Sequence, residues 1–190
     1  SGMEEKGWVV NVIDTKGDVA QLASRMEDVV SAKTDAIVLV STDPNLVQTQ
    51  IEKAAEANIP VFGCDSSFIE GMTVNATSDN AAMSETITHY LFDQMGGKGK
   101  LIVLTHRPHP GVLLRTTKLD DMLTEYPEIE VITEQHVEVP GPIENSRKTM
   151  ESLILANSEK DSITAVWCAW DEPAIGVSQA LADAGRDEVF

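Results

Sequence analysis

Short runs of apolar residues recur along the chain, and polar, turn-forming residues end each run. Four such runs lie at residues 37–40, 60–64, 101–104 and 165–169. Continuous apolar runs of this length are typical of parallel strands buried on both faces of a sheet. Open α/β sheets bind ligands just beyond the carboxyl ends of their strands, so the polar residues after each run are the candidate binding site.

The segments between these runs show the spacing of amphipathic helices. After Gly17, apolar positions recur three and four residues apart, at Val19, Leu22, Met26, Val29 and Val30. By the same reasoning and from their capping residues, further helices are expected over residues 44–57, 80–95, 111–124, 144–156 and 171–184. Additional strands are expected at residues 8–13, 72–76, 129–133 and 188–190.

One cluster of glycines, at residues 96–99, divides this alternation into two similar halves. The pattern predicts an α/β fold with flavodoxin-like or Rossmann-like parallel sheets, flanking helices and two lobes with a cleft between them. We expect an N-terminal lobe over residues 4–97 and a C-terminal lobe over residues 98–190. A hinge near Gly96 and Gly97 would let the lobes close.

Composition and charge narrow the range of partners. The chain has 190 residues, 42% of them hydrophobic, which is enough for a substantial core. Its formal net charge of −17 repels phosphate backbones and anionic lipid, so we expect neither a nucleic acid partner nor direct membrane insertion. Cys64 and Cys168 belong to no CxxC motif or Cys/His cluster, which predicts free, buried thiols.

The motifs of common catalytic sites are missing from the sequence. It contains no GxGxxG or GxxxxGK[ST] phosphate loop and no GxSxG nucleophile elbow. His106 and His109 are three residues apart, but their loop carries no acidic residue to complete a metal site. We therefore expect a binding protein with no cofactor and no metal, and not an enzyme.

Four motifs lie in order along most of the chain, at residues 59–65, 78–80, 115–127 and 165–176. Their sequences are IPVFGCD, SDN, RTTKLDDMLTEYP and AVWCAWDEPAIG. Together they resemble the motifs of type I periplasmic sugar-binding proteins. The resemblance implies a non-catalytic receptor that closes around a sugar or sugar alcohol and delivers it to the membrane permease of an ABC importer. It also implies an extracytoplasmic location, in the periplasm or as a cell-surface lipoprotein.

The resemblance also implies that parts of the family's fold lie outside this sequence. Members of that family begin with a strand, an aromatic-bearing loop and a helix before the segment equivalent to residues 8–13, and they continue well beyond Phe190. That first strand occupies the middle of the first sheet. We therefore expect the chain to be truncated at both ends, or completed by another chain.

Three residues are the leading candidates for ligand contact. The resemblance assigns sugar hydroxyls to Asp65 and Arg115, whose alternatives are a turn carboxylate and a solvated arginine. Trp170 stands where the family usually has Asn. An indole at a strand mouth offers a sugar ring its face and Nε1–H, although it also suits packing between the lobes. Trp167, within the strand, is expected in the core.

The remaining candidates are polar residues in the same loops, together with one proline. They are Ser41, Ser66, His106, Arg107, Pro140 and Asp171. Turn formation explains Ser41 equally well, and helix capping explains Asp171.

Three other functions remain open from the sequence. The first is the effector-binding domain of a LacI-type transcription regulator, and the second is the periplasmic sensor domain of a signalling kinase. An enzyme on a flavodoxin-like fold is the third, and the missing phosphate loop argues against it.

Overall fold

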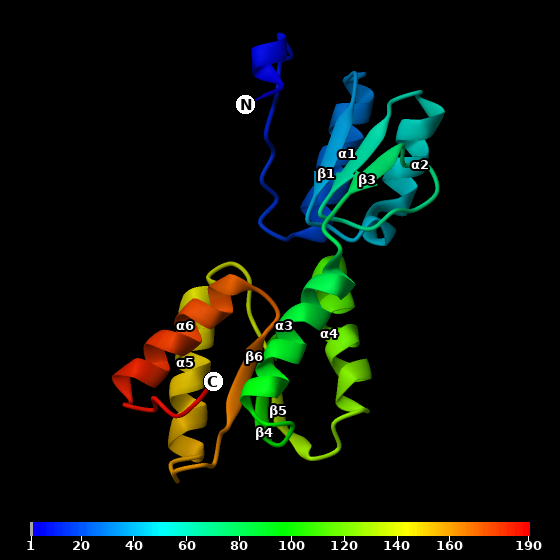
Figure 1. The fold of residues 1–190 in the computed structure, drawn as a ribbon. Coiled ribbons are helices and arrows are strands. Elements are labelled where there is room, and N and C mark those ends of the chain that lie inside the picture. Colours follow the sequence, from blue (N-terminus) through cyan, green and yellow to red (C-terminus); the bar gives the residue numbers. More distant parts are fainter. Residues whose placement is uncertain (1) are drawn as a thin grey trace.

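Two three-stranded parallel sheets form the framework of the molecule in the computed structural model, which describes residues 2–190 (Figure 1). The first sheet has the order β1-β2-β3, with β1 at Ile37–Val40, β2 at Val61–Cys64 and β3 at Val74–Ala76. The second has the order β5-β4-β6, with β4 at Gly99–Thr105, β5 at Ile129–His136 and β6 at Ala165–Cys168. All strand pairs are parallel, which confirms the predicted α/β class.

Helices connect these strands and cover the sheets. The first lobe contains α1 (Val19–Ser31), the 3-10 turn η2 (Pro44–Val47) and α2 (Gln48–Glu56). Helices α3 (Asn80–Gln94), α4 (Pro110–Leu123), α5 (Pro142–Ala156) and α6 (Asp171–Asp183) follow, and a short 3-10 turn η1 (Glu4–Lys6) precedes them all. All the predicted helices are present, although α4 and α5 begin one and two residues earlier than expected, at Pro110 and Pro142. Asp43 caps η2 and Pro44 follows it, as expected.

Strand β4 shows how the second lobe builds its core. Leu101 and Val103 pack in a cluster with Trp167, whereas Ile102 and Leu104 pack in a separate cluster with Met150. Successive side chains of a strand point to opposite faces, so each face of the sheet buries its own set of helices. The first cluster includes residues of α3 and α4, and the second includes residues of α5 and α6.

Helix α3 packs with the second lobe. Phe92 and Met95 belong to the same buried cluster as Leu101 and Trp167, and Figure 1 shows α3 beside α4 and β6. Gly96 and Gly97, both with left-handed backbones, form the turn from α3 into β4. The division after residue 97 stays a prediction, and this packing favours a boundary at residues 77–79, between β3 and α3.

The predicted strand at residues 8–13 is absent. This segment is an extended chain that runs apart from β1 in Figure 1, with Val9 91% and Val12 90% exposed. A strand exists only where a neighbour accepts its backbone hydrogen bonds, and residues 8–13 pair with no strand of the first sheet, whose β1 edge stays free. The apolar pattern favours a strand, but residues 8–13 have no hydrogen-bonded strand partner in the described chain, so this prediction is wrong.

The other end of the described chain behaves differently. Phe190 accepts a backbone hydrogen bond from Val166 and donates one to Thr164, so the end of the described chain meets the free edge of β6. Residues 188–190 do not form the expected strand, because only Phe190 makes these bonds. In the described part of the chain, no helix combines the length and the apolar character that a membrane span requires.

Candidate functional site

A recess of about 420 Å³ lies where the two lobes meet, at the carboxyl ends of β2 and β3. It is lined by Cys64, Asp65, Ala76, Thr77, Ser78 and Arg115. Asp65 follows the last residue of β2 in the first lobe, and Arg115 lies in α4 of the second lobe. Two of the three leading candidates therefore face one recess from opposite lobes.

The carboxylate of Asp65 collects polar partners from several segments. Ser41 Oγ donates to its Oδ2 at 3.3 Å, and Thr77 Oγ1 donates to its Oδ1 at 3.4 Å. Asp65 itself has a left-handed backbone, which aspartate tolerates better than most residues. These partners are hydroxyl groups of side chains, the type of donor that a sugar also offers.

Arg115 is held in a fixed orientation. Its Nε donates to Asn80 Oδ1 at 2.8 Å, and its Nη1 donates to the carbonyl of Ala169 at 2.9 Å. No acceptor for Nη2 occurs among the residues that the structure describes. The guanidinium is thus anchored on two sides and retains donor capacity.

Trp170 lies next to this arrangement without lining the recess. It follows Ala169, whose carbonyl binds Arg115, and its Nε1 donates to Glu172 at 3.1 Å. Its ring meets His106 edge-on, with centroids 6.4 Å apart, and His106 packs against His136 at 4.7 Å. Trp170 and His106 thus form an aromatic wall, although neither residue belongs to the lining of the recess. Trp167 is buried in the core, as predicted.

Arg107 is committed to two carboxylates instead of facing the recess. Its Nε and Nη2 donate to Glu134 at 2.7 Å each, and Nη1 and Nη2 donate to Asp120 at 3.0 and 3.3 Å. Hydrogen bonds to Glu134, and then to Asp120, raise the pKa of Arg107 further above its usual value. Arg107 thus links β5 to α4 through ion pairs. Because its guanidinium already binds these two carboxylates, its placement does not support the expected ligand contact.

Three other candidates for ligand contact also lie outside the lining of the recess. Ser66 is buried, its hydroxyl donates to the carbonyl of Thr42, and the lining of the recess does not include it, so its placement does not support the expected ligand contact. Asp171 is exposed in the first turn of α6, and Trp170, not Asp171, occupies the cap position. Pro140 is exposed in the loop between β5 and α5, and the lining of the recess does not include it.

The cysteines differ from each other in a way that the sequence did not predict. Both are free, but Cys64 is exposed and lines the recess, so the expectation that it is buried is wrong. Cys168 lies between the sheet and its helices, and burial raises the pKa of its thiol to about 12.

Two residues that support the site were not among the sequence candidates. Asn80 is buried at the start of α3, accepts from Arg115 and donates to Thr77 and Ser78. His109 caps α4, with Nε2 3.5 Å from Asp65 Oδ2. The position of His109 directly before Pro110, a preferred first helical residue, was the available signal that it is a helix cap.

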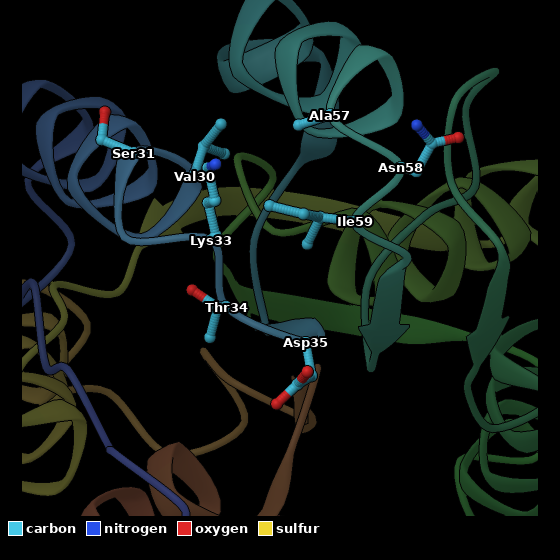
Figure 2. Close-up of a pocket in the computed structure, with 8 residues that line it drawn as sticks. All are labelled: Val30, Ser31, Lys33, Thr34, Asp35, Ala57, Asn58 and Ile59. Carbon is cyan, nitrogen blue, oxygen red and sulfur yellow. The ribbon is translucent and has the colours of Figure 1, made fainter.

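A larger hollow of about 560 Å³ lies elsewhere in the first lobe (Figure 2). It is lined by Val30, Ser31, Lys33, Thr34, Asp35, Ala57, Asn58 and Ile59. These residues end α1 and α2 and precede β1 and β2, so the hollow lies at the amino ends of the strands. Ligands of open α/β sheets bind at the opposite, carboxyl ends, so we assign the candidate site to the smaller recess.

Comparison with known proteins agrees with this architecture. A profile described as "Periplasmic binding protein domain" matches residues 2–190. The chain belongs to the periplasmic binding protein family. The resemblance seen in the sequence motifs is thereby confirmed.

Curated relatives in this periplasmic binding protein family match most of this chain at low sequence identity. The ribose import binding protein RbsB of Bacillus subtilis is 24% identical over 97% of this chain and 59% of its own length. The xylitol-binding protein of Mycolicibacterium smegmatis is 25% identical over 90% of this chain and 49% of its own. The chain thus spans about half to three fifths of these two curated relatives.

Solved structures of the family superimpose closely on the chain. An ABC sugar transporter subunit from Rhodobacter sphaeroides 2.4.1 matches with a TM-score of 0.90 and 23% identity, over 98% of this chain and 67% of that one. An ABC transporter solute binding protein from Agrobacterium vitis, with bound allitol, matches with a TM-score of 0.85 and 26% identity, over 93% and 61%. The two-lobed arrangement is thus the fold of this family.

Proposed function

We propose that the protein is a non-catalytic solute receptor of an ABC importer and that it binds a sugar or sugar alcohol between its lobes. The observation that carries this proposal is the placement of Asp65 and Arg115, which face one recess from different lobes. The names of its relatives, which include ribose and xylitol binders, support the same class of ligand. Extracytoplasmic placement, a lipid anchor and a permease partner belong to the same proposal.

The chemistry of the recess suits a neutral polyol. A carboxylate accepts hydrogen bonds from two adjacent hydroxyls, and a guanidinium donates to vicinal oxygens in a planar fork. One acidic and one basic group leave the recess close to neutral overall. Trp170 and His106 add an aromatic wall that can cover the apolar face of a sugar ring.

Contact of one ligand with both lobes would also change the conformation of the receptor. A ligand that contacts Asp65 and Arg115 together has more contacts when the lobes are closed than when they are open. Its differential affinity for the closed form shifts the population toward that form. The permease would then recognise the closed receptor.

Isothermal calorimetry on the complete protein, with ribose, xylitol and allitol as probes, tests this function. We expect at least one probe to bind with micromolar affinity or better. Asp65→Asn should abolish most of the binding, and Trp170→Ala should weaken it by about 1–3 kcal/mol, the scale of a lost aromatic contact. Asp28→Asn, an exposed change in α1 far from the recess, is the matched control and should bind normally.

Two results would count against parts of the proposal. Full affinity in Asp65→Asn would show that the ligand does not use this recess. Unchanged affinity in Trp170→Ala alone would remove the aromatic wall from the site and leave the carboxylate and guanidinium as its main contacts.

A further inference from the structure

His109 connects the two lobes at the candidate site. Its Nδ1 accepts the backbone N–H groups of Gly111 and Val112, at 3.1 and 3.3 Å, and so caps α4. Its Nε2 lies 3.5 Å from Oδ2 of Asp65, on the other lobe. One ring thus contacts the start of a helix with one nitrogen and the key carboxylate with the other.

The helix cap determines which tautomer this histidine adopts. A ring nitrogen that accepts hydrogen bonds carries no proton, so the neutral imidazole holds its proton on Nε2. That N–H is the group next to the Asp65 carboxylate. Helix α4 therefore presents a hydrogen-bond donor, through His109, to the first lobe.

We propose that His109 is a positioning residue for Asp65: capped into one tautomer by α4, it orients the carboxylate toward the recess and makes ligand binding sensitive to acid. The ligand part of this inference rests on the proposed function, whereas the contact between His109 and Asp65 does not.

The surroundings of His109 favour its neutral form. Burial is the main cause of its lowered pKa; Asp65, at the end of β2, acts in the opposite direction, and Arg115 in α4 and His106 in the preceding loop lower it further. Protonation of Nδ1 would remove the acceptor for two backbone N–H groups. It would also place a positive charge at the positive end of the helix dipole.

Acid should therefore disturb the site through this residue. An imidazolium at position 109 no longer caps α4, and it holds Asp65 as an ion pair in competition with ligand hydroxyls. Because the pKa of His109 lies below the usual value of about 6.5, the affinity should fall only as the pH drops below that value.

Two substitutions distinguish the role of Nδ1 in capping α4 from the role of Nε2 beside Asp65. His109→Asn keeps an oxygen near the Nδ1 position and still caps the helix, but its side chain is too short to reach Asp65. His109→Gln keeps an N–H group near the Nε2 position and loses the cap. Neither side chain titrates. His136→Gln, in the neighbouring ring stack, is the matched control.

Calorimetry on the complete protein, with the tightest binder among ribose, xylitol and allitol, should distinguish these variants. We expect His109→Asn to keep the wild-type melting temperature and to bind about 3- to 10-fold more weakly, the scale of one weak polar contact. We expect His109→Gln to bind normally and to melt at a lower temperature. Both should lose the decline in affinity below pH 6.5, and equal affinity and pH dependence in wild type and His109→Asn would overturn the inference.

A second measurement needs no ligand and so separates this inference from the proposed function. Nitrogen-15 NMR of the histidine rings should show the Nε2–H tautomer for His109, and Asp65→Asn should lower its pKa further. An Nδ1–H tautomer, or a pKa that Asp65→Asn leaves unchanged, would overturn the inference. If the NMR result is as expected and none of the probes binds, the proposed function fails while the contact between the lobes stands.

Discussion

The two sheets were built from similar apolar runs, yet they are buried to different degrees. In the second sheet, β4 lies between β5 and β6, and residues 101–105 are all buried. In the first sheet, β1 lies at an edge, where Val38 is 44% and Val40 60% exposed. A continuous apolar run thus predicts a strand that suits burial on both faces, but neighbouring segments decide whether that burial occurs.

The two sheets also differ at their free edges. Phe190 hydrogen-bonds along the free edge of β6, whereas the extended segment at residues 8–13 leaves the free edge of β1 unpaired. Unpaired edge groups are satisfied by water or by another strand. We therefore expect the second lobe to unfold less readily than the first.

The largest expected change in stability follows from a substitution in the central strand β4, compared with one in the edge strand β1. Leu104→Ala removes a fully buried side chain of β4 and should lower the free energy of unfolding by about 2–5 kcal/mol. Val40→Ala removes an exposed side chain of β1 and should change it by about 0.5 kcal/mol or less. Urea denaturation followed by circular dichroism measures both, and similar losses at the two positions would contradict the comparison.

An intermediate effect is expected where α5 and α6 approach closely. A Cβ atom on Gly176 would collide with the carbonyl oxygen of Ile143 and lie 2.9 Å from the backbone nitrogen of Arg147. Backbone atoms cannot move aside as a flexible side chain can, so Gly176→Ala should destabilise the second lobe by about 1–3 kcal/mol. Thermal denaturation checks this, with the exposed position Gln179→Ala as control; a melting temperature equal to that of the control would show that the helices separate easily.

The smallest effect concerns ion pairs and depends on pH. The hydrogen bond from Arg107 lowers the pKa of Glu134, so the ionised carboxylate stabilises the fold above its usual pKa. This contribution is lost as the pH falls through the lowered value. Both side chains are more than a third exposed, so Glu134→Gln should cost about 1 kcal/mol or less at pH 7 and almost nothing near pH 3.

The first lobe supplies the control for this last prediction. Glu27 forms one ion pair there, with Lys53 at 2.8 Å, whereas Arg107 binds two carboxylates. Glu27→Gln should have a smaller effect on the urea midpoint at pH 7 than Glu134→Gln. The reverse order would show that the network around Arg107 adds no stability over a single pair.

The sequence predicted most elements of the fold, because local signals specify them. Apolar runs, helical spacing and the capping residues before each helix depend on neighbours in the sequence. The prediction of a strand at residues 8–13 is wrong because strand pairing depends on a segment that is distant in the sequence. The packing of α3 is also non-local: the glycines after it mark a turn, and only the contacts of Phe92 show which lobe the helix joins.

The site was predictable to a smaller extent. The family resemblance predicts Asp65 and Arg115 together, and both line one recess, Asp65 from the end of β2 and Arg115 from α4. Arg107 and Ser66 looked equally suitable, but which polar group binds another part of the protein is decided by side-chain partners that the sequence does not display. For the same reason, the supporting role of Asn80 became visible only in its contacts with Arg115.

Two residues of the connection at 77–79, Thr77 and Ser78, line the recess, and Thr77 donates to Asp65 and accepts from Asn80. A pivot in this place is a short distance from the groups that hold the solute and a long distance from the outer ends of both sheets. A rotation of a few degrees would thus displace the outer surfaces far more than it stretches the contacts around a bound molecule. A small rearrangement at this connection would therefore produce a large change in the outline of the protein.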